Sequence, residues 1–359
     1  MLGVKEPKEG RDIQLTLDAE LQAFTQKQFQ GRRGAVIVME LTQGGILAMN
    51  SSPSYDPNLF ASLRGRKEVG KYFKDETSPM FDRAIQGQYP PGSIFKIVTG
   101  LAALEAHKIT ASTVFRCPGF YALGKNIFHC WNEKGHGSQG LTEAYAHSCD
   151  VFFYLTGLSA GADAIRRKAE EFGFAAPSGV DLPGEKKGLL PSREWKQRTQ
   201  HSSWFDGDTL NFAIGQGYLQ VTPMQALGMI AVVATDGERL KPHLVDKIDD
   251  TAVAERHSVR LEFAPEYLSA VKTGLDQVVN SDTGTGRLAR IPGVRVVGKT
   301  GTAEAGKDKN THAWFIGYAP AEKPKVALVV FLEHGGHGGV EAATVAKAVL
   351  MKLKETGYL

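Results

Sequence analysis

The sequence predicts an α+β fold in which both ends of the chain contribute to one antiparallel sheet of five strands. Two strand-like runs, residues 34–39 and 45–49, lie near the beginning of the chain, and three more lie within residues 294–332. The long stretch between them has mainly the apolar spacing of helices. Because the strands lie at the two ends, we expect one sheet with an inserted all-helical subdomain.

The elements at the two ends have the clearest patterns. The first expected helix covers residues 18–32 and leads into a hairpin that turns at residues 41–44. A helix at residues 340–353 closes the chain. The three strands before it are expected at residues 294–298, 313–318 and 326–332.

The middle of the chain is less regular. Residues 51–88 are rich in Pro, Gly and charge, and are expected to form an irregular connection with short helices. A Pro-Pro-Gly break at residues 90–92 precedes a buried helix that ends near Ala106. Helical stretches are expected at residues 140–174 and 222–234, and a turn-rich passage at residues 177–191.

The composition excludes some classes of protein. The 359 residues are 42% hydrophobic and 23% charged, as in ordinary globular proteins. The formal net charge is only +3 and long Lys/Arg runs are absent from the sequence, which excludes a nucleic-acid-binding protein. The sequence also has no apolar run of about 18 residues and no signal peptide. We expect either a cytosolic protein or a soluble piece of a longer, anchored one.

Three cysteines, Cys117, Cys130 and Cys149, are too few for a disulfide framework. A bond between Cys117 and Cys130 would close a short loop and stabilise the fold by roughly 3 kcal/mol in an oxidising compartment. A zinc site is the alternative, but the close ligand spacing of zinc motifs is absent, so we predict no metal site. The histidines in the same stretch are His129, His136 and His147.

Ser93 and Lys96 are the first candidates for chemistry. Their spacing on a helix puts a hydroxyl and an amine on neighbouring positions of one face. The lysine can act as a general base if burial and a second cation lower its pKa from about 10.4 by roughly 2 to 3 pH units. The motif alone is weak, since about one chance match is expected in a chain of this length, and a capping serine beside a solvated lysine is the alternative.

A second motif, Ser148-Cys149-Asp150, precedes an apolar helical run. The Ser148 hydroxyl is placed to relay a proton to or from Ser93. A polar helix surface is the alternative interpretation of this segment taken alone. Cys149 is interpreted as a packing residue.

The tripeptide Lys-Thr-Gly occurs twice. Lys272 lies in a run with helical apolar spacing, so its glycine falls inside a helix. Lys299 follows a strand-like run, where a glycine lets a ligand approach the backbone closely. We therefore predict that Lys299, with Thr300, Gly301 and Thr302, belongs to the functional site and that Lys272 does not.

The three motifs occur in the order found in penicillin-binding proteins and class A β-lactamases. Further segments extend the likeness over residues 10–353, and the chain resembles class B penicillin-binding proteins of the elongation type, penicillin-binding protein 2. These segments are residues 89–96, 214–218, 312–320 and 333–339.

The resemblance implies a transpeptidase fold of the penicillin-binding protein/β-lactamase type. Residues 15–359 would form the transpeptidase domain, with a helical subdomain at roughly 55–290 inserted between strands 33–50 and 294–333. Residues 1–14 would be a linker remnant from a missing N-terminal pedestal. We therefore expect a soluble excised module of a protein that acts at the periplasmic face of the cytoplasmic membrane.

By the same resemblance, the chain is a peptidoglycan D,D-transpeptidase. Ser93 would attack the penultimate D-Ala of a stem peptide, and an amine of a neighbouring stem would then take the acyl group. Lys96 would be the base, and Ser148 would pass a proton to the leaving nitrogen. Lys299 would supply positive charge, and the backbone N–H groups of Ser93 and Thr302 would form the oxyanion hole, worth roughly 3 to 4 kcal/mol each.

The resemblance also assigns substrate-binding residues. Thr300 and Thr302, on either side of Gly301, would hold the substrate carboxylate. Asp150 stands where the wider family has asparagine, and a carboxylate cannot donate as an amide does. Its role stays open between pairing with Lys96, holding the substrate amide and a structural part.

The implied ligands are stem peptides and β-lactam antibiotics, with no cofactor. A SEDS-family glycan polymerase and elongation scaffold proteins are the implied partners, through the N-terminal region. One alternative is a D,D-carboxypeptidase or β-lactamase-type hydrolase, although residues 177–191 show no clear glutamate motif for a deacylating water. The other is a non-catalytic β-lactam sensor, against which intact Ser93, Lys96, Ser148 and Lys299 argue.

Some remaining features have structural interpretations. Residues 215–217 are expected to shape the floor of the site, and the turn at residues 284–286 lacks the strand–helix context of a phosphate cradle. Aromatic and histidine residues near the end of the chain are interpreted as packing and loop residues rather than metal ligands. They are His312, Trp314, His334 and His337.

Overall fold

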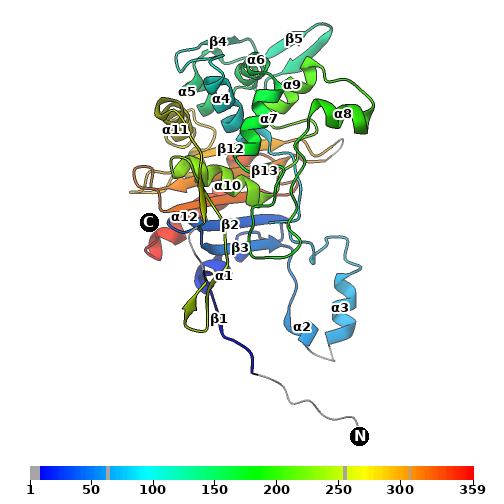
Figure 1. Ribbon diagram of the computed structural model, residues 1–359, viewed down its shortest axis with the longest axis vertical. Coiled ribbons are helices and arrows are strands. Elements are labelled where there is room, and N and C mark those ends of the chain that lie inside the picture. The colour runs from blue at the N-terminus through cyan, green and yellow to red at the C-terminus, as the bar shows by residue number, and fades with distance from the viewer. Residues whose placement is uncertain (1–8, 62–64, 254–256, 307–308) are drawn as a thin grey trace.

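The computed structural model describes residues 9–61, 65–253, 257–306 and 309–359. A five-stranded antiparallel sheet lies at its centre, and its blue and orange strands in Figure 1 come from the two ends of the chain. The strand order is β12-β13-β14-β2-β3, so a C-terminal strand, β14, pairs with an N-terminal strand, β2. The predicted sheet is confirmed. Its strands are β2 (Gly34–Glu40), β3 (Ile46–Ser52), β12 (Val297–Ala303), β13 (His312–Ala319) and β14 (Val326–Leu332).

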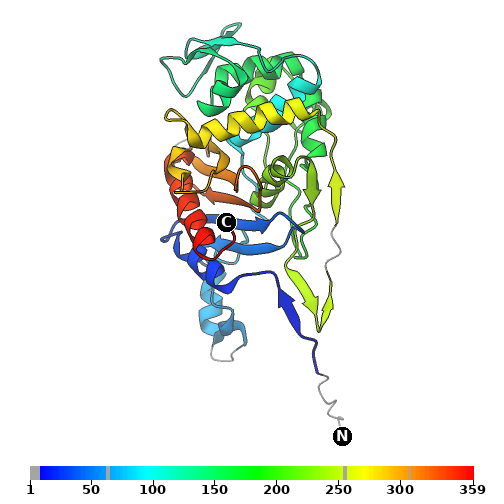
Figure 2. The same cartoon turned by 90° about the vertical axis from the view of Figure 1, so that its left-hand side faces the viewer.

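Strands β13 and β14 lie between β12 and β2 in the sheet. Both are buried along their whole length. Helix α10 packs against β13, β14 and β2, while α1 and α12 lie on the opposite face of the sheet (Figure 2). Because helices cover both faces, these strands are continuous apolar runs rather than alternating ones. The helices are α1 (Ala19–Lys27), α10 (Pro223–Ala234) and α12 (Ala343–Glu355).

A mainly helical region lies above the β12 side of the sheet (Figure 1). Its central helix is α4 (Lys96–Glu105), in which residues 96–104 are all buried, and which contacts α6, α7 and α11. A helix that is apolar all round is suited to such a position. The other helices of this region are α5 (Leu141–Ala146), α6 (Asp150–Ala160), α7 (Ala162–Glu171), α8 (Arg193–Gln200), α9 (Asp206–Ala213) and α11 (Pro265–Asn280).

The sequence analysis expected an all-helical inserted region. The structure shows that this region also contains short strands. Short strands form two-stranded pairs, β4 with β7 and β5 with β6, and further strands lie at the side of the sheet. Each has two to four residues, which is too short to show an alternating pattern. They are β4 (Phe115–Cys117), β5 (Phe120–Leu123), β6 (Asn126–His129), β7 (Gly137–Gln139), β8 (Glu238–Leu240), β9 (Val245–Ile248), β10 (Thr251–Ala252) and β11 (Ser258–Arg260).

Two segments lie away from the central body (Figure 1). Helices α2 (Asn58–Ala61) and α3 (Arg66–Tyr72) form an arm within the connection that the sequence analysis expected to be irregular with short helices. Strand β1 (Ile13–Leu15) pairs with β9, so structure begins within the expected 1–14 linker, whose first eight residues lie outside the described part. In the described part of the chain, no helix has both the length and the apolar character needed to cross a membrane.

Candidate active site

Ser93 lies in a 3₁₀ turn, Gly92–Phe95, that runs directly into helix α4. The residues after it, Ile94 and Phe95, are fully buried, whereas Ser93 itself is only partly buried. The apolar side chains therefore anchor the turn in the core and leave the serine accessible at its rim. The prediction that Ser93 lies in the first turn leading into a buried helix is confirmed.

This turn packs tightly against strand β12. Gly92 has a φ of 56°, and a Cβ at this position would lie 2.6 Å from the carbonyl oxygen of Thr302. A Cβ at Gly301 would lie 2.8 Å from the carbonyl oxygen of Pro91. Both positions require glycine, because a larger residue would push the turn away from the strand. The backbone of Ser93 is thereby held beside Thr302.

Two hydrogen bonds fix the same turn from other directions. The indole N–H of Trp314 donates to the carbonyl oxygen of Pro90 at 3.1 Å, and the backbone N–H of Gly92 donates to the carbonyl oxygen of Gly215 at 2.9 Å. A Cβ at Gly215 would lie only 2.2 Å from the carbonyl oxygen of Gly92. The 215–217 segment thus forms the floor under the turn, and Trp314 is a packing residue, as the sequence predicted.

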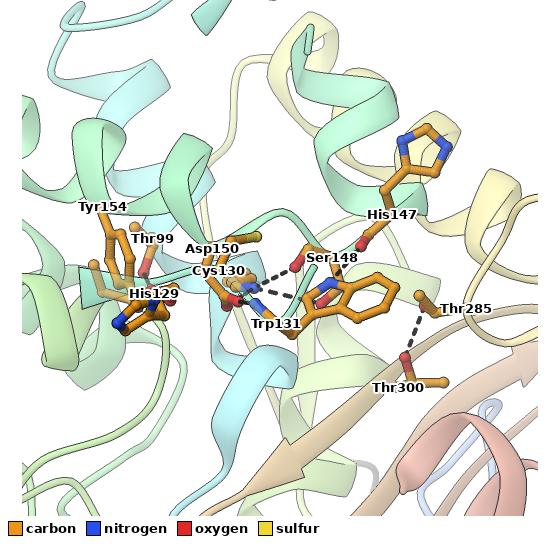
Figure 3. A network of polar contacts seen from close by, with 12 residues as sticks. Thr99, His129, Cys130, Trp131, His147, Ser148, Asp150, Tyr154, Thr285 and Thr300 are labelled. Carbon is orange, nitrogen blue, oxygen red and sulfur yellow. Dashed lines mark hydrogen bonds and ion pairs between the residues drawn. The ribbon is translucent and has the colours of Figure 1, made fainter. Parts of the chain in front are cut away.

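Lys96 and Asp150 form a buried ion pair. The Nζ of Lys96 donates to Oδ1 of Asp150 at 2.7 Å and to the carbonyl oxygen of Ser148 at 2.9 Å. Asp150 is the first residue of α6, where the helix N-terminus stabilises a carboxylate. Its other oxygen accepts the backbone N–H of Trp131 at 2.9 Å (Figure 3). Of the roles left open for Asp150, pairing with Lys96 is the one this geometry shows.

Ser148 lies between two amines. Its Oγ accepts a hydrogen bond from Nζ of Lys299 at 2.9 Å and lies 3.4 Å from Nζ of Lys96. Ser148 also has a left-handed backbone, with φ of 53°, which is uncommon for a residue other than glycine and must be held by its surroundings. The three polar motifs of the sequence therefore meet at this hydroxyl.

Lys299 is fully buried on β12, and its Nζ also donates to the carbonyl oxygen of Thr300 at 3.0 Å. Burial, followed by the cation of Lys96, lowers the pKa of Lys299 well below its ordinary value, and Asp150 opposes this in part. The ammonium form of Lys299 is therefore less stable than that of an exposed lysine.

The second Lys-Thr-Gly tripeptide lies elsewhere. Lys272 is on helix α11, and its Nζ lies 2.6 Å from Oδ1 of Asp236, whose side chain is 67% exposed. The prediction that Lys299 lies on a strand and Lys272 inside a helix is confirmed.

The threonines after Lys299 point to two loops. The Oγ1 atoms of Thr300 and Thr285 lie 2.8 Å apart (Figure 3), and Oγ1 of Thr302 accepts the backbone N–H of Gly338 at 3.2 Å. The backbone N–H of Thr285 donates to the carbonyl oxygen of Ala146, just before the Ser148 motif. Thr285 thus links the second and third motifs. The sequence analysis missed this role, because only a Gly-Thr-Gly turn signal was available there.

The histidines near the end of the chain behave as packing and loop residues. The ring of His312 packs at 5.3 Å from that of Tyr89 and at 5.5 Å from that of Phe331, and its Nδ1 accepts the backbone N–H of His334. Burial, followed by His334, lowers the pKa of His312 to about 4, so the ring is neutral at physiological pH.

A second cluster of reactive side chains lies beside the Ser148 motif. The ligand atoms of Cys117, Cys130, His136 and Cys149 all lie within 4.8 Å of one another. All three cysteines are buried and free. Three thiols and one imidazole are a donor set of structural zinc sites, so these residues could hold a metal. The sequence analysis predicted no metal site because close ligand spacing is absent, and these four ligand atoms become neighbours only through folding.

A partly exposed serine beside two buried lysines and a glycine-containing strand is the arrangement expected for the active-site serine enzymes that include penicillin-binding proteins and β-lactamases. The chain belongs to the penicillin binding protein transpeptidase domain family, whose model matches residues 34–351. The resemblance inferred from the sequence motifs is confirmed.

Individual relatives agree with this assignment. The chain is 36% identical to the peptidoglycan D,D-transpeptidase MrdA of Acinetobacter baumannii, over 97% of this chain and 54% of that protein. It is similar to the crystal structure of Pseudomonas aeruginosa PBP2 in complex with WCK 5153, with a TM-score of 0.89 and 36% identity over 96% of this chain and 76% of the other. The chain is also similar to PBP2 of Helicobacter pylori in complex with MreC, with a TM-score of 0.89 and 34% identity over 97% of this chain and 64% of the other. The chain spans about half the length of the curated relatives it matches.

Proposed function

We propose that this chain is the catalytic domain of a peptidoglycan D,D-transpeptidase that crosslinks stem peptides through an acyl-enzyme on Ser93 during cell elongation. The observation that carries the proposal is the position of the Ser148 hydroxyl, 2.9 Å from Nζ of Lys299 and 3.4 Å from Nζ of Lys96, next to the strand against which the Ser93 turn packs. The relative from Acinetobacter baumannii, which is named as a peptidoglycan D,D-transpeptidase, supports the choice of substrate.

The first half-reaction is acylation. Ser93 Oγ attacks the carbonyl carbon of the penultimate D-Ala, and Lys96 takes the Ser93 proton in those molecules in which its Nζ has given up the proton of the resting ion pair with Asp150. The ammonium group that results is stabilised by Asp150, 2.7 Å away. The Ser148 hydroxyl then passes a proton to the leaving nitrogen of the terminal D-Ala, and the ammonium group of Lys96, 3.4 Å from Ser148 Oγ, replaces that proton.

The charge that develops on the carbonyl oxygen needs hydrogen-bond donors. The close packing of the Gly92–Phe95 turn on β12 supports the backbone N–H groups of Ser93 and Thr302 as the oxyanion hole. Thr300 and Thr302 are assigned to the substrate carboxylate, with the Lys299 ammonium form supplying positive charge. Gly301 leaves the backbone open to the substrate.

The hydrogen bonds of Glu185, the glutamate of the turn-rich 177–191 passage, argue against a β-lactamase-type deacylating base in this passage. One of its oxygens accepts the backbone N–H of Ser178 at 2.7 Å and the other accepts that of Gly179 at 3.1 Å. A carboxylate that holds its own loop in this way is not available to activate a deacylating water. The acyl-enzyme should therefore persist until an amine of a neighbouring stem peptide arrives.

The same proposal covers the setting of the enzyme. We assign residues 15–359 to the transpeptidase domain, which begins close to strand β1, and place the working protein at the periplasmic face of the cytoplasmic membrane. The Helicobacter pylori relative was solved as a complex with MreC, which supports elongation scaffold proteins as partners. A SEDS-family glycan polymerase is the second proposed partner, through the N-terminal region.

Incubation with a fluorescent penicillin, followed by intact-protein mass spectrometry, tests the acyl-enzyme. We expect a stable adduct that disappears in Ser93→Ala and persists in Lys272→Ala. A donor stem peptide with an amine acceptor should then give a crosslinked product and free D-Ala. Rapid turnover of the penicillin would favour a β-lactamase, and a chain that forms no adduct would contradict the proposed function.

A further inference from the structure

A cavity of about 420 Å³ lies between helix α10, the segment that follows helix α7 and the paired strands β8 and β11. Strand β8 contacts α10 on one side and pairs with β11 on the other (Figure 2). A cavity of this size can hold a small molecule. Among the described residues that line it, none belongs to the Ser93, Ser148 or Lys299 motif, so the cavity is separate from the candidate active site.

One wall of the cavity is apolar. Gln225 of α10 also lines it, but its amide is already engaged, because Nε2 donates to the carbonyl oxygens of Ala176 and Lys187. Its Oε1 accepts the backbone N–H of Thr222 at 3.0 Å. A ligand therefore meets mainly hydrocarbon on this side, and burial of an apolar body there favours binding. The buried apolar side chains of the wall are Met39, Phe172, Met224, Leu227 and Leu240.

Gly228 leaves the cavity open. It lies inside α10, away from both helix ends, where glycine is the least favourable residue except proline. A Cβ at Gly228 would have nothing within 4 Å, and the backbone there is not left-handed. By contrast, a Cβ at Gly100 of α4 would lie 2.0 Å from the hydroxyl oxygen of Tyr145, so packing requires that glycine. Packing does not require Gly228, and a larger side chain there would occupy the cavity.

Two cations lie at the rim of the cavity. Arg239 on β8 donates one N–H to the carbonyl oxygen of Glu171 at 2.9 Å, which fixes the guanidinium and leaves its other N–H groups for a ligand. Lys241 is exposed, and within the described residues its Nζ has neither a hydrogen bond nor a carboxylate partner. The described residues that line the cavity include no Asp or Glu. The rim therefore offers positive charge to a ligand.

We propose that this cavity binds one small amphipathic anion. Its apolar body lies against α10, and its single carboxylate, sulfate or phosphate group pairs with Arg239 and Lys241. The guanidinium suits such a group because its planar N–H donors can bind two oxygens at once. A cationic ligand would be repelled by the rim, and a neutral one would leave both cations unpaired. The site goes beyond the proposed function, because it uses none of the catalytic residues.

Two matched fluorescent probes test the site. Anilinonaphthalene sulfonate should bind one equivalent per chain, and N-phenylnaphthylamine, which has the same rings without the sulfonate, should bind roughly tenfold or more weakly. Gly228→Leu should abolish binding of both probes, because leucine fills the cavity. Its matched control is Gly70→Leu on α3, another helical glycine whose Cβ would have nothing within 4 Å, which should bind like the parent chain.

The charge of the rim is tested by Lys241→Glu. This variant should bind the sulfonate roughly tenfold or more weakly and should keep its affinity for N-phenylnaphthylamine within about twofold. Lys125→Glu makes the same charge change at an exposed lysine between β5 and β6, and should leave both affinities unchanged.

Several outcomes would overturn the site. Unchanged sulfonate binding in a folded Gly228→Leu variant would place the probe elsewhere, and binding of several equivalents would show a general apolar surface. If Gly228→Leu loses its circular dichroism, Lys241→Glu decides, and parent affinity in that variant would overturn the anion site. A chain acylated on Ser93 by penicillin should bind the sulfonate as before, whereas displacement would locate the probe in the active site. A chain that binds the sulfonate and forms no penicillin adduct would contradict the proposed function and support this site.

Discussion

Replacing Asp150 with asparagine removes the charge from a buried ion pair while keeping the shape of the side chain. One carboxylate oxygen accepts from Nζ of Lys96 at 2.7 Å, and the other accepts the backbone N–H of Trp131 at 2.9 Å. Asparagine has only one side-chain oxygen, so its NH₂ group must face one of these donors. The substitution therefore costs both a charge partner and a hydrogen bond.

The size of the effect follows from burial. Removing one partner of a buried ion pair typically costs about 3 to 5 kcal/mol, because the other charge is left uncompensated. The side chains of Lys96 and Asp150 are 0% and 11% exposed, so water screens this pair little. The matched control is Asp236→Asn, which breaks the pair with Lys272, where the Asp236 side chain is 67% exposed. An exposed pair of this kind is worth about 0 to 1 kcal/mol.

Urea unfolding followed by circular dichroism measures both free energies of unfolding. We expect Asp150→Asn to lower the free energy of unfolding by about 3 kcal/mol or more, and Asp236→Asn to lower it by less than about 1 kcal/mol. Equal losses in the two variants would refute the reasoning, because they would show that Lys96 does not depend on Asp150 for its charge balance.

Three further predictions concern β12 and its neighbours. Lys299→Ala should slow acylation roughly a hundredfold, whereas Lys272→Ala should leave the rate within about twofold; equal rates would overturn the choice between the two tripeptides. Because burial puts the folded-state pKa of Lys299 below its unfolded value of about 10.4, the unfolded chain binds more protons between these two values. Relative to Lys299→Met, the free energy of unfolding of the parent chain should therefore rise with pH in that window, by at most about 1.4 kcal/mol per pH unit, and parallel pH curves would contradict this. Thr285→Val should lower kcat/KM for a stem-peptide mimic by roughly twofold to tenfold, because the hydrogen bond to Thr300 is lost. Thr285→Ser keeps a hydroxyl and should have the parent kcat/KM. If the serine variant has the same low kcat/KM as the valine variant, the effect comes from packing.

The sequence alone determined the sheet and the residues of the three motifs. The strands 313–318 and 326–332 could be predicted because their apolar runs are long and uninterrupted, as burial on both faces requires. The choice of Lys299 over Lys272 also followed from local pattern, since a strand and a helix have different apolar periods.

The short strands of the inserted region could not be predicted in this way. Each has two to four residues, and β5 and β6 in particular have only exposed and partly buried positions, without a buried apolar face. Such strands form because the tertiary fold places their backbones side by side. Their pairing is not visible in the composition or the apolar periodicity of the sequence.

Only the tertiary structure decided what surrounds the motifs. The contacts of Asp150 with Trp131 and of Thr300 with Thr285 join residues distant in sequence, and one of them uses a backbone N–H, which every non-proline residue has. The cysteine–histidine cluster shows the same limit most clearly. Its ligands lie far apart without the close pairs of common zinc motifs, so spacing argued against a metal, while the pairing of β4 with β7 and the start of α6 placed all four within 4.8 Å. The sequence supplied the reactive groups, and the long-range folding of the chain determined which of them meet.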